Sequence, residues 1–191
     1  MAVSCRPLAF LLLLALAPAG CGNERTPPPA VGAEPSEETK TLDYPGVGLS
    51  VDLPRDFIVE RSKRPGVFRA TFGSAAVSAF AYRRREELPG NEKELKKALE
   101  RLEKATKERS STFELTESRT LDVDGSRAIE LLGGQTISQS RLRTRSLHVF
   151  EGKGEYVIEM LAPVRQFDRL DKQLFDLIRD SLEVTGKVPR A

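Results

Sequence analysis

The sequence is poor in the side chains that carry most nucleophilic, redox and metal chemistry. Its 191 residues include no tryptophan, one histidine and two cysteines. The cysteines are Cys5 and Cys21, and none occurs from Asn23 to Ala191. A domain formed by those later residues therefore has no cysteine nucleophile, no thiolate metal site and no redox dithiol. A domain of this size can build a core without disulfides, so their shortage does not oppose export from the cytoplasm.

An excess of charge of one sign is also missing. The 30 basic and 28 acidic residues leave a formal net charge of +2, which is too small to predict a nucleic acid or an anionic membrane as the partner. The hydrophobic fraction of 39% and the charged fraction of 30% are typical of a soluble globular domain. No phosphate-binding glycine loop, Walker pattern, G-x-S-x-G elbow or H-E-x-x-H motif occurs. We therefore expect no catalytic residue, no cofactor and no metal site.

The amino-terminal segment has the pattern of an export signal. Arg6 supplies a positive charge, and Leu8 to Ala17 form an apolar run that is too short to span a bilayer as a helix. Two small residues then precede Cys21 directly. The segment resembles the lipobox of bacterial prolipoproteins, which are diacylated on the cysteine and cleaved just before it. Pro18 departs from that pattern, which has a branched apolar residue three positions before the cysteine.

This resemblance predicts a signal peptide at residues 1–20 and a lipid anchor on Cys21. Two acyl chains, such as palmitate, suffice for stable anchoring where one does not. The protein is then expected in the cell envelope, anchored to the membrane and facing outside the cytoplasm. Two alternatives remain open: an ordinary signal peptide cut after Ala17 or Ala19, and a retained anchor helix.

The rest of the chain divides by composition. Residues 21–40 are rich in Pro, Glu, Ser and Gly and nearly lack large apolar side chains, so we predict a disordered tether that follows the lipidated cysteine. Alternating apolar residues begin at Thr41 and predict a single α+β domain over residues 41–185. Residues 186–191 form a short C-terminal tail.

Period-two alternation within the domain predicts eight strands in two groups of four. Their expected ranges are 47–53, 57–59, 67–72, 76–83, 113–123, 127–132, 142–151 and 155–161. Tight turns such as Asp124-Gly125 and Gly152-Lys153-Gly154 favour antiparallel pairing. The pair Gly133-Gly134 is expected to end or bulge its strand.

Two segments change to the three-and-four spacing of amphipathic helices. The first covers Asn91 to Arg109, where Asn91 and Glu94 suit a capping box and the many charges predict a solvated outer face. The second covers Gln166 to Leu182. The expected fold class is therefore α+β: an antiparallel β-sheet with two main amphipathic helices packed on it.

The segment Gly48–Phe57 resembles the opening of PsbP-like domains, in which a glycine and a serine precede alternating apolar residues, a proline and an aromatic residue. The Asp124-Gly125 turn is similar to theirs, as is the run Tyr156–Glu159 that leads to Pro163 and a final helix. The resemblance extends over residues 42–184. It implies the α/β/α sandwich shared with Mog-type Ran-binding proteins and LpqN-type lipoproteins, and a non-enzymatic accessory or binding role. The metal-binding and partner-binding residues of the plant photosystem members have no counterpart here.

Two polar features are best explained without a site. His148 has no visible nucleophile or second metal ligand beside it, so a hydrogen-bonded or surface residue of a strand is the simpler interpretation. Asp122 and Asp124 are similar to the start of a calcium loop, but no bidentate glutamate follows at the required distance. A turn stabilised by aspartate explains that pair.

The best candidate for a partner-binding site is the alternating triplet Arg141, Arg143 and Arg145, because guanidinium groups bind carboxylates and phosphates in bidentate fashion. Acidic residues on neighbouring strands are the alternative partners of this triplet. The run Arg83-Arg84-Arg85 extends the patch only if it does not simply lie in solvent.

Three functions follow as hypotheses. The first is non-catalytic binding of a protein or other envelope component by the anchored domain. The second is a carrier or chaperone for a small apolar ligand, which requires a clear apolar cavity of at least about 300 Å³ between sheet and helix. The third is a small hydrolase, which is disfavoured unless His148 lies in a cleft beside a serine and a carboxylate.

Overall fold

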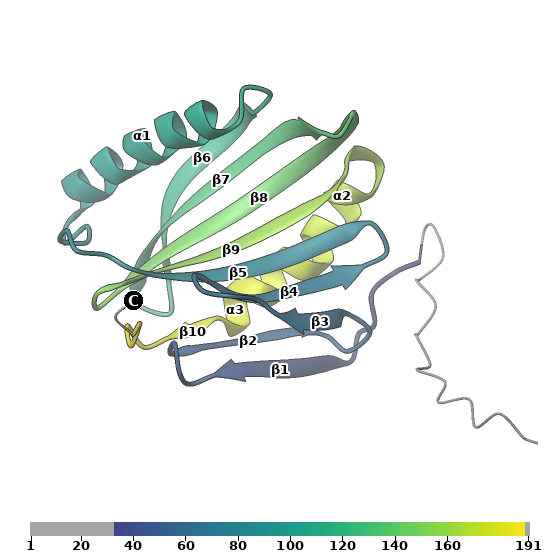
Figure 1. Ribbon diagram of the computed structural model, residues 1–191, viewed down its shortest axis with the longest axis horizontal. Helices are drawn as coiled ribbons and strands as arrows, with labels where there is room; N and C mark the ends of the chain where they lie inside the picture. The colour runs from purple at the N-terminus through teal and green to yellow at the C-terminus, as the bar shows by residue number, and fades with distance from the viewer. Residues whose placement is uncertain (1–32, 190–191) are drawn as a thin grey trace, which may run out of the picture.

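The computed structural model describes residues 33–189. Seven strands form one antiparallel sheet, in the spatial order β3-β4-β5-β9-β8-β7-β6 (Figure 1). These strands are β3 (Ile58–Arg61), β4 (Gly66–Phe72), β5 (Ala75–Arg83), β6 (Glu114–Val123), β7 (Ser126–Ile137), β8 (Ser140–Glu151) and β9 (Gly154–Pro163). A smaller sheet has the order β1-β2-β10, with β1 (Thr39–Tyr44), β2 (Leu49–Pro54) and β10 (Glu183–Val184).

Tight turns set the register of the long hairpins in the large sheet. Asp124 and Gly125 join β6 to β7 with φ angles of 48° and 78°, the left-handed conformation that a two-residue hairpin turn requires. Gly152 has a φ of 58° in the turn between β8 and β9. Both turns were predicted from the sequence and are confirmed. The hairpins pair β8 with β7 and β9 along their whole length, so β8 lies inside the sheet.

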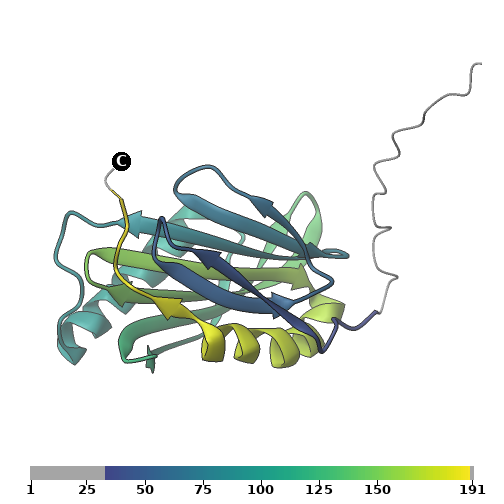
Figure 2. The same ribbon diagram turned by 90° about the horizontal axis from the view of Figure 1, so that it is seen from below.

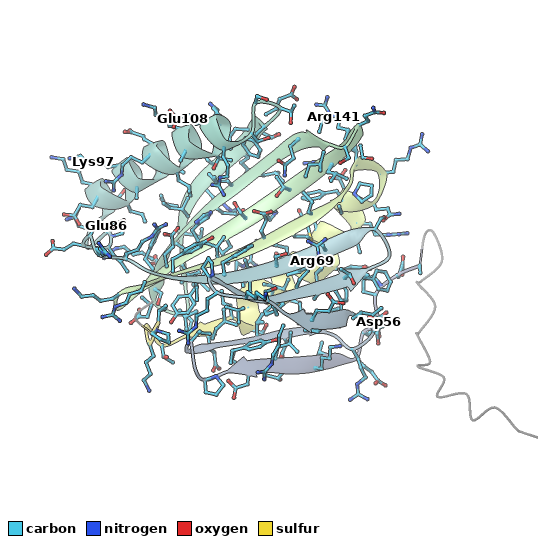
Figure 3. The ribbon with its side chains drawn as sticks, in the orientation of Figure 1. Asp56, Arg69, Glu86, Lys97, Glu108 and Arg141 are labelled. Carbon is cyan, nitrogen blue, oxygen red and sulfur yellow. The ribbon has the colours of Figure 1, made fainter. Side chains whose placement is uncertain are left out.

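Helix α1 (Glu92–Arg109) lies over β6 and β7 on one face of the large sheet. Asn91 caps its N-terminus, because the Asn91 side chain accepts a hydrogen bond of 3.0 Å from the backbone N–H of Glu94. The helix buries Leu95 against β7, in a small core whose buried members are Leu95, Ile129 and Leu131. The side chains of Lys97 and Glu108 lie on its outer side (Figure 3), so the predicted solvated face is confirmed.

The opposite face of the large sheet is covered by the C-terminal helical segment and the small sheet (Figure 2). This segment is not the single regular helix expected from the sequence. It comprises α2 (Val164–Leu170), a π-helical turn η1 (Asp171–Phe175) and α3 (Asp176–Ser181). A π-helical turn holds an extra residue, which lets the sequence neighbours Leu174 and Phe175 both enter the main core.

The expected fold class, α+β with an antiparallel sheet and two amphipathic helical segments, is confirmed. The expected number of strands is wrong, because β1 and β10 were not predicted. β1 is an edge strand with no fully buried residue, and β10 has only two residues, so neither has a strong apolar pattern. Among the helices of residues 33–189, none has the length and apolar character needed to cross a membrane.

Of the two alternatives expected at Gly133-Gly134, an end of the strand is wrong, while a bulge is present opposite Gly133. β7 continues through both glycines to Ile137. The irregularity lies instead in β6, where the register shifts between Leu115 and Glu117, opposite Gly133. A bulge in the partner strand accommodates the extra residue without terminating the ladder.

Candidate binding groove

A groove of about 650 Å³ runs between α1 and the large sheet. It exists because α1 packs mainly on β6 and β7, at one side of the sheet. The same face of β5, β9 and β8 extends beyond the helix (Figure 1). The groove is therefore lined by the inner side of α1, by side chains that alternate along β5, β9 and β8, and by Leu131 and Gln135 of β7.

Aromatic side chains form the apolar part of the groove. Phe80 and Tyr82, alternate residues of β5, stack with ring centroids 6.2 Å apart. Phe113 borders the groove from the connection between α1 and β6. Gly133 leaves room for this ring, because a Cβ atom at that position would lie 2.5 Å from Phe113 Cζ. Because Gly133 has no side chain, the Phe113 ring can lie against it and form one wall of the groove.

A buried ion-pair cluster lies in the groove. The Glu155 carboxylate, 5% exposed, has Oε1 2.8 Å from Nδ1 of His148, and Oε2 accepts hydrogen bonds from Nε and Nη2 of Arg84. Burial raises the pKa of the Glu155 carboxyl, but the hydrogen bonds and charge interactions with His148 and Arg84 outweigh burial and hold that pKa below its ordinary value. Arg84 also lies over the Tyr82 ring, 5.3 Å from its centroid. The prediction that His148 is a hydrogen-bonded strand residue is confirmed.

Ser146, two residues before His148 on the same face of β8, also lines the groove. A serine, a histidine and a carboxylate therefore meet in one groove, which is the combination that the hydrolase hypothesis required. The geometry of a nucleophile is missing, since no hydrogen bond within residues 33–189 joins Ser146 to His148. An oxyanion hole needs free N–H donors, and the backbone of β8 is engaged on both sides by β7 and β9. The arrangement fits hydrogen bonding to a ligand better than acyl transfer.

The groove is amphipathic and balanced in charge. Its cationic side chains are Arg84 and Arg109, and its acidic side chains are Glu155 and Glu159. Polar groups that make no side-chain hydrogen bond within the described part of the chain also border it, namely Thr144, Ser146 and Gln135. A ligand with both apolar groups and hydrogen-bonding groups matches this lining better than a pure hydrocarbon does.

The structure places the arginine triplet elsewhere, and two of its members, Arg143 and Arg145, contact the C-terminal helical segment. Arg141 pairs with Glu114 of β6 at 2.5 Å, and both side chains are exposed. Arg143 pairs with Asp168 of α2, and its guanidinium lies 4.7 Å from the centre of the Phe167 ring.

Arg145 is the most enclosed of the three, with a side chain only 14% exposed. It pairs with Asp171 of η1 and with Glu130 of β7. Each member of the triplet thus has an intramolecular carboxylate, but Asp168 and Asp171 belong to the C-terminal helical segment and not to neighbouring strands, where the alternative interpretation expected the partners. A partner-binding role for Arg141, Arg143 and Arg145 stays a prediction.

The remaining sequence predictions concern the Asp122 and Asp124 pair and the lipidation site Cys21. Asp124 lies in the β6–β7 turn, as expected, and Asp122 lies just before it in β6. Within residues 33–189 no group of three histidine, cysteine or acidic side chains is arranged to hold a metal ion. Cys21, with the predicted signal peptide and most of the tether, lies outside the described residues.

Glu155 was not predicted as a partner of His148. Its signal was present in the β8–β9 hairpin, because a turn at Gly152 sets a register in which Phe150 faces Glu155 and His148 lies diagonally across from it. Arg84 had no comparable signal, because it joins the cluster through the pairing of β5 with β9, which are far apart in the sequence.

The layered arrangement of one antiparallel sheet between α1 and a C-terminal helical segment is the PsbP-like fold. No known family model and no curated protein sequence matches the chain. Solved structures do match. The solution structure of the cyanobacterial PsbP protein CyanoP from Synechocystis is 15% identical, covers 82% of this chain and 98% of its own, and has a TM-score of 0.59.

Two further structures extend the comparison. LpqN of Mycobacterium tuberculosis, described as involved in cell envelope biogenesis, is 11% identical over 78% of this chain and 91% of its own, with a TM-score of 0.55. The Saccharomyces cerevisiae Ran-binding protein Mog1p is 9% identical over 77% of this chain and 95% of its own, with a TM-score of 0.53. These likenesses establish the fold, as the sequence resemblance predicted. They carry no function over to this chain.

Proposed function

We propose that the chain is the precursor of a bacterial lipoprotein, anchored through Cys21, whose domain binds an extended segment of an envelope protein in the groove beside α1. The domain acts by binding and not by catalysis. The observation that carries this proposal is the groove itself, an amphipathic channel along the uncovered face of three central strands.

The lining favours a protein segment over a small apolar ligand. A peptide presents backbone N–H and C=O groups to hydroxyl and amide side chains such as Ser146 and Gln135, and its apolar side chains pack on Phe80 and Phe113. A hydrocarbon ligand would leave these polar groups without partners, which costs free energy. The volume of the groove exceeds the roughly 300 Å³ that the carrier hypothesis requires. That hypothesis also requires an apolar cavity, whereas the lining of this groove is partly polar.

The extracytoplasmic location is supported by the export signal and by one structural neighbour. The apolar run that ends before Cys21 matches the pattern of prolipoproteins. LpqN, which shares the fold, is described by its role in cell envelope biogenesis. Both point to a protein that works at the outer face of a membrane.

Site-specific photo-crosslinking in the native bacterium tests the proposal. A benzophenone amino acid replaces Gln135 or Thr106 in the groove, and Lys97 or Arg69 at exposed control positions. We expect one and the same protein to be captured from both groove positions and from neither control. Phe80→Ser should remove the adduct while the thermal unfolding midpoint changes little. Equal capture from the control positions, or an adduct that survives Phe80→Ser, would contradict the proposal.

The hydrolase hypothesis is tested separately, because Ser146, His148 and Glu155 do line one groove. A fluorophosphonate probe labels serine nucleophiles that a histidine activates. We expect no labelling of the wild-type chain and none of Ser146→Ala. Labelling that Ser146→Ala abolishes would show that the groove is catalytic and would overturn the proposed function.

A further inference from the structure

A second cleft, of about 720 Å³, lies at the end of the domain where the chain terminates. Four segments and the last described residues meet around it. The backbone N–H of Ala81 donates to the carbonyl of Pro65 at 3.0 Å, which ties the turn before β4 to β5. The backbone N–H of Arg84 donates to the carbonyl of Lys153 at 3.0 Å, which ties the end of β5 to the β8–β9 turn. Backbone pairing thus holds these walls in place.

The charge of this cleft is strongly one-sided. Among the described residues, its lining includes five cationic side chains and no acidic one; the cations are Arg64, Arg83, Arg84, Arg85 and Lys153. The chain as a whole has a net charge of only +2, so this concentration is local. A concave site lined by charge of one sign focuses the electrostatic field and attracts counter-charged ligands.

Only part of this charge is used within the domain. Arg84 pairs with Glu155, and Nη1 of Arg83 donates to the carbonyl of Val188 at 2.8 Å. Within the described part of the chain, no side-chain hydrogen bond or ion pair engages the remaining cations, which are Arg64, Arg85 and Lys153. Gathering unpaired like charges opposes folding, and a bound anion relieves that repulsion.

The walls between these cations are apolar. Val47, Pro65, Ala81 and Val188 line the same cleft. The cleft volume lies within the range of small-molecule sites, roughly 300–1,000 Å³. Guanidinium groups match the geometry of phosphate oxygens in bidentate contacts.

We propose that this cleft binds a phosphorylated amphiphile, with its phosphate on Arg64, Arg85 and Lys153 and its apolar group on the wall formed by Pro65 and Val188. The site is separate from the groove function, although Arg84 and Tyr82 border both cavities. The last described residues, which line this cleft, lie at the end of the domain opposite the first described residues (Figure 1). The phosphate can come from a soluble molecule or from a lipid headgroup.

Calorimetric titration of the full chain tests this site. The chain carries Cys21→Ser, so that no acyl group is added, and is purified in a non-ionic detergent. The probes are inorganic phosphate, hexyl phosphate, hexanoate, and micelles mixed with phosphatidylglycerol or phosphatidylcholine. The test variant combines Arg64→Gln, Arg85→Gln and Lys153→Gln. The control variant removes the same charge from the exposed side of α1 by Lys93→Gln, Lys97→Gln and Arg101→Gln.

We expect hexyl phosphate to bind more tightly than inorganic phosphate or hexanoate, and the test variant to weaken it at least about tenfold. The control variant should bind like the wild type. Unchanged affinity in the test variant, or an equal loss in the control variant, would show that the cleft is not the site. Hexanoate binding as tightly as hexyl phosphate would rule out phosphate recognition.

The micelle arms distinguish the source of the phosphate. Binding of phosphatidylglycerol micelles that depends on the three cations supports a lipid headgroup. Binding of hexyl phosphate without such micelle binding supports a soluble ligand. The three substituted residues do not line the groove beside α1, so the crosslinking experiment and this one can fail independently.

Discussion

Arg145 donates two parallel hydrogen bonds to Asp171, Nε to Oδ1 and Nη2 to Oδ2, each 2.7 Å long. This bidentate pair joins β8 to the first residue of the π-helical turn η1. The same guanidinium also donates from Nη1 to Oε1 of Glu130, which is 2% exposed, and it lies 5.2 Å from the centre of the Phe175 ring. Arg145 therefore ties the C-terminal helical segment to the sheet, so its contacts serve the fold.

Replacing Arg145 should destabilise the domain much more than replacing Arg141. Arg145→Ser leaves the half-buried Asp171 without its partner and the buried Glu130 with Arg119 alone, which should cost about 2 kcal/mol of unfolding free energy. Arg141→Ser breaks only an exposed pair with Glu114 and should cost less than about 0.5 kcal/mol. Urea unfolding of both variants measures the difference. Equal stability of the two variants would contradict the structural role of Arg145.

The Glu155 cluster should make the domain sensitive to acid. The pKa of Glu155 lies below its ordinary value in the folded state. Burial raises this pKa, but His148 and Arg84 together lower it by more than burial raises it. Because of this lowered pKa, the Glu155 carboxylate stabilises the fold at pH values above its ordinary pKa of about 4.5. This stabilisation is lost as the pH falls through the lowered pKa.

Glu155→Gln should therefore flatten the loss of stability below about pH 4.5, and should cost about 2 kcal/mol near neutral pH because Arg84 and His148 lose their charged partner. Glu159→Gln, on the same strand, removes a carboxylate that bonds to neither of them and serves as the control. Urea midpoints across pH measure both effects. An acid limb for Glu155→Gln as steep as that of the wild type would exclude this role.

Gly133 should be intolerant of a side chain, because the Phe113 ring occupies the space. Gly133→Ala places a Cβ atom 2.5 Å from Phe113 Cζ and 2.7 Å from the Glu114 carbonyl oxygen, so the groove wall must shift at a cost of about 1–3 kcal/mol. Gly134→Ala is the matched control, since its nearest neighbour is the Leu142 carbonyl oxygen at 3.4 Å. Thermal unfolding and the crosslinking yield at Gln135 should both fall for Gly133→Ala alone.

The lipid anchor is tested by intact mass spectrometry of the protein from its native bacterium. We expect a mature chain that begins at Cys21 and carries acyl groups, because the apolar run before it is too short to remain as a membrane span. Cys21→Ser should release the protein from the membrane fraction, because no acyl chain can then be attached at this position. An unmodified Cys21 still joined to the preceding residues would refute the anchor.

Local patterns allowed much of the fold to be predicted. The period of apolar residues located α1 and the large hairpins, and Asp124-Gly125 marked a turn because its backbone conformation favours those residue types. The predictions failed where local pattern is weak. β10 has two residues and exists only because β2 offers it a partner, and the π-helical turn adjusts a helix to the sheet beneath it.

The candidate site was less accessible to prediction. His148 has no partner near it in the sequence, but the hairpin register places Glu155 diagonally across from it. The triplet Arg141, Arg143 and Arg145 attracted attention because its charges alternate along a strand, but acidic residues of β6, β7 and the C-terminal helical segment neutralise it. Charge spacing in one segment does not reveal which carboxylates lie opposite.

By itself, the sequence determined the fold class, since this depends on short-range periodicity and composition, and from the same kind of pattern it predicts an export signal. Only the tertiary structure decided where function can lie. The pairing of β5 with β9 brings Arg84 to Glu155, and the position of α1 over β6 and β7 leaves the central strands open beside it. Both relationships join residues that are distant in the chain, and their free energy comes from packing and burial, which no local pattern encodes.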